Sequence, residues 1–337
     1  MSENLFFDSQ IAALEKVGTV LHDEGVLLKM CCMVVLYSLD MRPTDQKEAV
    51  LRIYDDYMSL YGKRIRWTTN PSTGSWKKLK SGPADYLQPH DWIPDSQNGY
   101  RMVFHGGEKK TDATDLTFYA AAKREDQVLS KDLSMIHCRF PMGDIFEGKV
   151  ILPEIAQRWC SWLRPLHGHG GLGLGRSFGY ENQALSWSTE TDMLLRMPGL
   201  QLWGVTEGMG FPQRQEGLYN GPRCADWLLS LSDTFLDKLG GLDGIKKNMA
   251  DGLLLYPYEG GAVLQAGPLP NTGSTEYDIC LNYYEQLGRL IEPVRAKKLS
   301  AELTIGTTDE DIKSDKERSK KWHERFSPHA FDSSPRQ

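Results

Sequence analysis

The stretch VLLKMCCMVVLYSL, residues 26–39, is the most apolar run in this sequence of 337 residues. Lys29 interrupts it, and its fourteen residues are fewer than the roughly 20 that a membrane-spanning helix needs. A run rich in Val, Leu, Met and Cys is typical of a strand that is buried on both faces. The sequence therefore predicts a long buried strand here, and with it a sheet.

Outward from this strand, the first half of the chain alternates helices with strands. A helix is expected over residues 5–22, and a second over 44–62, where Val50, Ile53 and Tyr57 recur at helical spacing after Thr44 as cap. Residues 62–98 are rich in Trp, Pro, Gly and Lys, which indicates short strands and loops. Further strands are predicted over residues 100–104, 116–122 and 133–140.

The second half shows the same alternation. The sequence predicts helices over residues 152–163, 181–197, 226–239, 245–249 and 277–291, a glycine-rich extended segment over 166–178, a strand over 198–206, and a hairpin that pairs 253–256 with 262–266. Residues 300–337 form a polar, charged tail, expected to be a solvent-exposed helix over 309–326 and disordered over the last ten residues.

Together these elements predict an α/β fold of the α+β type. Its mixed, largely antiparallel sheet carries flanking helices in two closely packed lobes, residues 1–148 and 149–299.

The composition is that of a globular protein, with 40% hydrophobic and 25% charged residues. The net charge of -6 disfavours general nucleic-acid binding and suits a basic protein partner. We expect a cytoplasmic protein, because no signal peptide and no membrane span is visible. The six cysteines form no CxxC pair and are expected to be free, buried and reduced.

Several motifs resemble catalytic sites but are incomplete. Residues 168–173 match a dinucleotide fingerprint, yet no strand precedes them and no helix begins within the glycines, so we expect a closely packed strand instead. His167 and His169 lie on one face of that strand, near Cys160, but further metal ligands are missing, which favours packed histidines. An SxxK match at residues 75–78 lacks its partner motifs and indicates a surface loop.

Ser177, in the pattern GRSFG at residues 175–179, is the strongest nucleophile candidate. The histidines after it, His323 and His329, both lie in the polar tail, which is a poor place for a catalytic base. The sequence therefore predicts no catalytic residues, no metal and no cofactor, and a serine hydrolase that uses Ser177 stays an alternative.

Two charged regions allow binding functions. Residues 62–82 carry six Lys and Arg, two tryptophans and no acid, which leaves a nucleic-acid binder as a second alternative to a solvated hairpin. Residues 179–280 carry thirteen acidic against six basic residues, and such an excess can steer a basic partner toward the chain.

The order of several motifs resembles a known family. They are GLG at 171–173, MPGL at 197–200, ADWL at 225–228, LGG at 239–241, GGAVLQAGP at 260–268 and LIEPVR at 290–295. In this order they resemble the TsiV/TsiT-like immunity proteins of type VI secretion systems, found beside restriction-endonuclease-like toxins such as VRR-Nuc nucleases. The resemblance covers about residues 27–299, is strongest over 165–295, and leaves the tail after residue 300 outside.

This resemblance implies a non-catalytic protein that neutralises a cognate type VI nuclease effector by direct binding. It implies no membrane or direct nucleic-acid partner, and both a monomer and a dimer stay open. Inhibitor interfaces are anchored by a few aromatic or Arg residues inside a polar rim. On that basis the expected toxin-contacting residues are Trp76, Asp91, Trp92, Asp95, Glu207 and Glu259.

Overall fold

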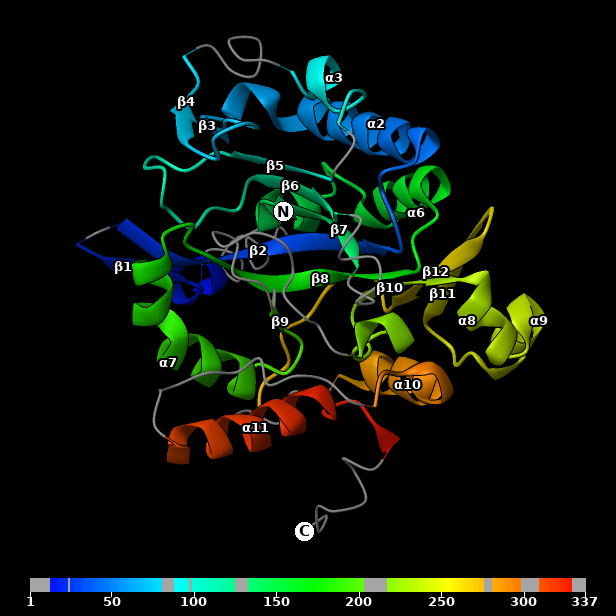
Figure 1. Ribbon diagram of the computed structural model, residues 1–337. Coiled ribbons are helices and arrows are strands. Elements are labelled where there is room, and N and C mark those ends of the chain that lie inside the picture. The colour runs from blue at the N-terminus through cyan, green and yellow to red at the C-terminus, as the bar shows by residue number, and fades with distance from the viewer. Residues whose placement is uncertain are drawn as a thin grey trace.

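In the computed structural model, twelve strands of the described residues form one central sheet (Figure 1). The structure describes residues 13–23, 25–80, 88–96, 99–124, 133–202, 217–275, 281–297 and 309–328. The strand order is β11-β12-β10-β8-β2-β7-β6-β5-β3-β4, with β1 added to β2 and β9 added to β8. All strand pairs are antiparallel except β8 with β9. The predicted fold class, a largely antiparallel sheet with flanking helices, is confirmed.

The strands are β1 (Thr19–His22), β2 (Gly25–Ser38), β3 (Trp67–Thr69), β4 (Trp76–Lys78), β5 (Tyr100–His105), β6 (Thr117–Ala122), β7 (Ser134–Phe140), β8 (His167–Arg176), β9 (Gln201–Leu202), β10 (Leu228–Ser232), β11 (Leu253–Tyr258) and β12 (Gly261–Ala266). β2, the apolar strand predicted from residues 26–39, lies between β7 and β8. It therefore joins strands from both sides of the lobe boundary expected at residue 148 into one sheet.

Helices lie on both sides of this sheet. They are α2 (Thr44–Tyr61), α3 (Pro89–Trp92), α5 (Met142–Phe146), α6 (Leu152–Leu163), α7 (Tyr180–Arg196), α8 (Asp233–Lys238), α9 (Gly241–Asn248), α10 (Asn282–Ile291) and α11 (Asp309–His323), with 3-10 turns at Gly62–Arg64, Leu218–Asn220 and Glu292–Val294. In Figure 1, α2, α3 and α6 lie above the sheet, and α7, α10 and α11 lie below it.

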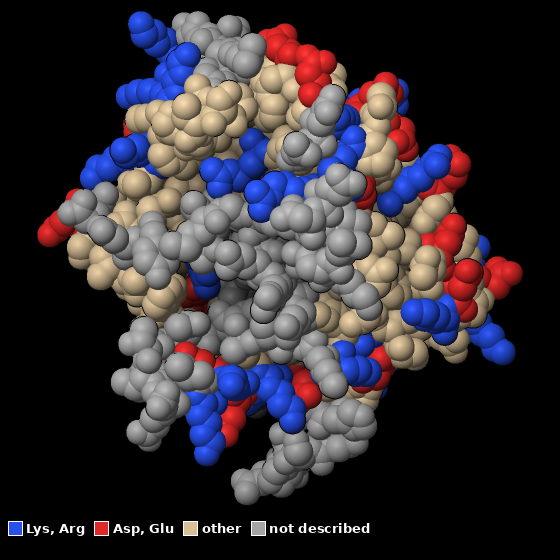
Figure 2. Space-filling view, viewed as in Figure 1, with Lys and Arg blue, Asp and Glu red and all other residues tan. Residues whose placement is uncertain are grey.

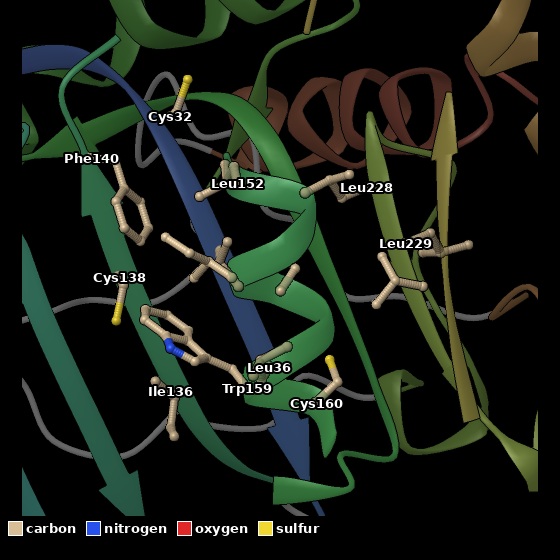
Figure 3. Packing of buried hydrophobic residues seen from close by; sticks show 14 of the residues in the cluster. Cys32, Leu36, Ile136, Cys138, Phe140, Leu152, Trp159, Cys160, Leu228 and Leu229 are labelled. Carbon is tan, nitrogen blue, oxygen red and sulfur yellow. The ribbon is translucent and has the colours of Figure 1, made fainter. Parts of the chain in front are cut away.

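Alternate residues of β2 enter different cores. Cys32, Val34 and Leu36 pack into the larger cluster, where α6 covers β2 and β7 with Leu152 and Trp159 (Figure 3). Cys31, Met33, Val35 and Tyr37 pack into a smaller cluster on the opposite face. Burial on both faces explains why the strand is apolar throughout instead of alternating.

Three local predictions were wrong. The helix expected over residues 226–239 begins only at Asp233, because Leu228–Ser232 pairs as β10 with β8 on one side and β12 on the other. Strand residues buried on both faces show no alternation, so Leu228, Leu231 and Phe235 fit helical spacing equally well. At the N-terminus, Thr19–His22 is a strand instead of a helix end. Thr44 is the first residue of α2 and makes no side-chain cap.

The tail helix was expected to be exposed, and this too was wrong. α11 buries Asp315, Ser319, Trp322 and His323. Just after it, the Arg325 guanidinium stacks on Trp322 with 4.0 Å between its carbon and the ring centroid, and Arg325 Nε donates to the Pro198 carbonyl at 2.6 Å. A Cβ at Gly288 of α10 would collide with the Phe326 carbonyl, so this glycine allows the close approach. The buried face of α11 is mostly polar, so the spacing of hydrophobic residues did not predict that this helix is buried.

Cys31, Cys32, Cys138, Cys160 and Cys224 are buried and free, as expected, and Cys280 lies outside the described residues. Among the helices of the described part of the chain, none combines the length and apolar character that crossing a bilayer requires.

Candidate functional site

The two histidines of β8 are held by hydrogen bonds in the protein interior. His167 Nε2 lies 2.7 Å from the Leu218 carbonyl, and His169 Nδ1 lies 3.1 Å from Asp226 Oδ2. Burial lowers the pKa of His167 to about 4, lowers the pKa of His169 well below its ordinary value, and raises that of Asp226. Cys160, the third member of the possible metal site, bonds instead to Ser230 at 3.3 Å.

The cavity beside these histidines holds about 10 Å³, roughly the space of one water molecule. It is too small for a substrate. No cluster of three or more potential metal ligands occurs among the residues that the structure describes. The prediction that the two histidines pack and hydrogen-bond is therefore confirmed.

The glycine run of residues 168–175 lies within β8, and its glycines make room for neighbouring side chains. A Cβ at Gly175 would stand 2.6 Å from a guanidinium nitrogen of Arg139, and one at Gly171 would stand 2.5 Å from Asp226 Oδ1. The run is thus a closely packed strand, as expected, and not the start of a phosphate-binding helix.

Ser177 is fully buried at the end of β8. Its hydroxyl donates to the Thr111 carbonyl and accepts the Gly179 N–H at 3.0 Å. A nucleophile elbow instead holds the serine exposed above the sheet, beside a histidine base. Ser177 therefore joins the end of β8 to the loop at Thr111.

Within the basic segment, the described residues 62–80 include the β3–β4 hairpin, which lies at one end of the sheet, at the upper left of Figure 2. Trp67 Nε1 donates to the Gly107 carbonyl at 3.1 Å, and the Trp76 ring packs on His105 with 5.0 Å between centroids. Arg66 pairs with Glu108. Tryptophans held in this way are not free to stack on bases, which favours the solvated hairpin.

The structure separates the expected contact residues. Trp76 packs with the smaller cluster on one face of the sheet, whereas Trp92 packs with the larger cluster on the other. Glu259 lies in the turn between β11 and β12, at the opposite end of the sheet from Trp76. Glu207 lies outside the described residues.

Asp91, Trp92 and Asp95 lie in and just after α3, which packs against α2. Lys47 Nζ of α2 donates to the Ser96 carbonyl at 2.5 Å, and Tyr54 of α2 donates to Gln88 Oε1 at 2.7 Å. Asp91 closes a capping box at the start of α3, where its carboxylate accepts the Gln88 N–H at 3.0 Å. Asp91 and Asp95 are exposed.

Glu259 is held by the residue that ends α6. Arg164 Nη2 lies 2.8 Å from Glu259 Oε1, and both side chains are largely exposed. Arg164 is the one non-glycine residue with positive φ in the described part of the chain, at 48°. A left-handed backbone at a residue with a Cβ stores strain, which tends to occur at functional sites.

A groove of about 260 Å³ runs between α2 and α6. Its lining includes Asp45, Gln46, Glu48 and Arg52 from α2, and Trp162 and Arg164 from α6 and its cap. Sequence reasoning missed these residues. The sequence feature that could have pointed to them is the end of α6, where Arg164 takes the left-handed position that glycine or asparagine usually occupies.

α3, α2, α6 and the β11–β12 turn thus form one continuous surface, which we call the α2–α6 face. It holds four of the six expected contact residues, Asp91, Trp92, Asp95 and Glu259. Charged side chains of both signs lie over it at the upper right of Figure 2.

The strain at Arg164 can be measured. Arg164→Gly is expected to raise the free energy of unfolding by about 1 kcal/mol, because glycine adopts this backbone without steric cost and the exposed ion pair with Glu259 contributes little. Urea unfolding would measure it, with Arg164→Ala as the matched control that keeps the strain. A glycine variant less stable than the alanine variant would contradict the assignment.

A family model described as "TsiV: Type VI immunity for VRR-NUC" matches residues 49–326. The chain belongs to the TsiV family. The match extends through α11 to Phe326, so the tail expected to lie outside the family pattern is part of it. The docking of Trp322 and Phe326 into the TsiV core agrees with this extent.

Among solved structures, this TsiV chain is similar to the "Pseudomonas aeruginosa T6SS protein PA0821", with a TM-score of 0.80 and 18% identity. The likeness covers 97% of this chain and 92% of that one, and at this identity it is a likeness of fold. No curated relative matches the TsiV chain.

Proposed function

We propose that this TsiV chain neutralises a VRR-Nuc nuclease effector of a type VI secretion system by binding it directly, without catalysis. The observation that carries the proposal is the family match over residues 49–326. The embedded position of Ser177 and the small cavity beside His169 support a binding role rather than hydrolysis. The chain acts in the cytoplasm, where a nuclease that enters a cell meets DNA.

The α2–α6 face is the surface that we assign to the effector. It combines the exposed carboxylates of Asp91 and Asp95, the Arg164–Glu259 pair and the groove between α2 and α6. Nucleases bind phosphates through Lys and Arg side chains, so their DNA-binding surfaces are basic. Acidic groups on a partner can steer toward such a surface and compete with DNA for it.

The test uses the purified full chain and a catalytically inactive form of the effector encoded beside it. We expect binding with a Kd on the order of nanomolar by biolayer interferometry, and rescue of growth when the chain is produced together with active effector. A non-cognate VRR-Nuc effector is the control. Absence of binding, or binding without rescue, would overturn the proposal.

A further inference from the structure

The first part of α7 buries polar side chains and exposes apolar ones. Within residues 182–191, which we call the 182–191 segment, the buried side chains are all polar; they are Asn182, Gln183, Ser186, Glu190 and Thr191. Leu185 is 54% exposed, and the half-buried Trp187 belongs to neither core cluster of the described residues. A surface helix ordinarily shows the opposite pattern, with an apolar stripe turned toward the core. The 182–191 segment is therefore an inverted amphipathic helix.

The last turn of α7 is attached in the ordinary way. Met193 and Leu194 are buried in the larger core cluster, and Leu195 packs against it. Burial of an apolar face is the main contribution that holds a helix to a protein. The side chains of the last turn make this contribution and those of the 182–191 segment do not, so the two parts of α7 are held with different strength.

Polar contacts with the end of β8 hold the 182–191 segment instead. Arg176 donates to the Glu190 carboxylate, and Gln183 Nε2 donates to the Ser177 carbonyl at 2.8 Å. The attraction within a buried ion pair is largely offset by the lost hydration of both charges, and opening restores that hydration. Gln183 Oε1 is also buried without a hydrogen-bond partner among the described residues, which costs free energy that exposure to water would recover.

We propose that the 182–191 segment opens from the sheet as a unit while the rest of the chain stays folded. The Arg176–Glu190 pair is the latch of this cover, and the last turn of α7 is its hinge. Segments that open locally are those with few buried apolar contacts. In the open form Arg176 and the end of β8 become accessible. The inference goes beyond the proposed function and does not depend on it, because it concerns the chain without its effector.

Hydrogen exchange of the full chain, read by mass spectrometry, tests the opening. α6 is the matched reference helix, because its buried face is largely apolar and includes Leu152, Ile155, Trp159 and Leu163. After correction for intrinsic rates, we expect the amides of residues 184–191 to exchange at least about 100-fold faster than those of residues 156–163. Low concentrations of urea should accelerate exchange in α6 more than in the 182–191 segment, because global unfolding exposes more surface than the opening of one segment.

Variants of the full chain test the latch. Glu190→Gln removes the counter-charge of Arg176 in the closed form and is expected to accelerate exchange of residues 184–191 by about tenfold or more. Asp192→Asn makes the same chemical change in the exposed pair with Arg196 and should leave that exchange within about threefold. Leu185→Gln should also leave it within about threefold, because the leucine is exposed and both residues suit a helix.

The comparison of the two helices in the intact chain needs no variant, so it decides the matter even if Glu190→Gln does not fold. Equal protection of both helices, or equal acceleration of both by urea, would show that α7 opens only with the whole protein and would overturn the inference. So would a folded Glu190→Gln variant with unchanged exchange in residues 184–191, or an Asp192→Asn variant accelerated to the same extent. The proposed function is tested separately, by effector binding.

Discussion

Glu190→Ala is expected to lower the free energy of unfolding by about 3–5 kcal/mol, because it leaves the guanidinium of Arg176 buried without its counter-charge. In the intact protein Arg176 Nε and Nη2 both donate to the Glu190 carboxylate, at 2.6–2.9 Å, and the two side chains are 9% and 2% exposed. The pair ties α7 to the end of β8. Urea unfolding followed by circular dichroism measures the loss.

The same helix provides a matched control. Asp192 pairs with Arg196 one turn further along α7, and both side chains are more than half exposed. Asp192→Ala should therefore cost less than about 1 kcal/mol. The double change Arg176→Met with Glu190→Leu removes both charges and should recover much of the stability lost in Glu190→Ala. If Glu190→Ala lowers the free energy of unfolding no more than Asp192→Ala does, the buried Arg176–Glu190 pair does not stabilise the fold.

Acidification from pH 7.5 to 5.5 is expected to cost about 4 kcal/mol of stability through three buried histidines. Burial lowers the pKa of His105 to about 3 and that of His167 to about 4, and it lowers the pKa of His137 well below the ordinary value of 6.5. In this window the unfolded chain binds protons at these histidines and the folded protein does not. Stability is therefore fully present above about pH 6.5 and falls as the pH drops below it, by about 1.4 kcal/mol for each histidine between pH 7.5 and 5.5.

Urea midpoints at the two pH values measure this loss, provided that the slope of the transition stays the same. His167→Asn keeps a polar side chain near the Leu218 carbonyl but does not titrate, so it should reduce the loss between the two pH values by about 1.4 kcal/mol, whatever its effect at pH 7.5. If His167→Asn lost as much stability as the intact protein between the two pH values, His167 would not be held neutral by the fold.

Local patterns in the sequence determined much of the fold. Residue types that lie next to one another in the sequence predicted three of its elements: the apolar strand at residues 26–39, the glycine-rich strand at 166–178 and the hairpin around Gly260. Apolar runs favour buried strands and glycines favour tight turns, so these elements could be recognised locally. The order of short motifs also indicated the immunity family, which the family match confirms. The sequence left a serine hydrolase that uses Ser177 as an alternative with an incomplete set of catalytic partners, and the buried hydrogen bonds of Ser177 disfavour that alternative.

Contacts between distant residues were decided only by the tertiary structure. Leu228–Ser232 is a strand because β8 and β12 provide hydrogen-bond partners on both sides, and α11 docks by a mostly polar face that shows no hydrophobic periodicity. Trp76 of β4 and Trp92 of α3 pack on opposite faces of the sheet, although the two residues are close in sequence.

The α2–α6 groove also depends on contacts between residues that are distant in sequence. Gln46 and Trp162 face one space, and Arg164 meets Glu259, because α2 and α6 pack side by side above the sheet. A sequence pattern reports which face of an element is buried, but it contains no information on which other element covers that face. The packing of distant elements supplies this information, and the proposed effector site is made from it.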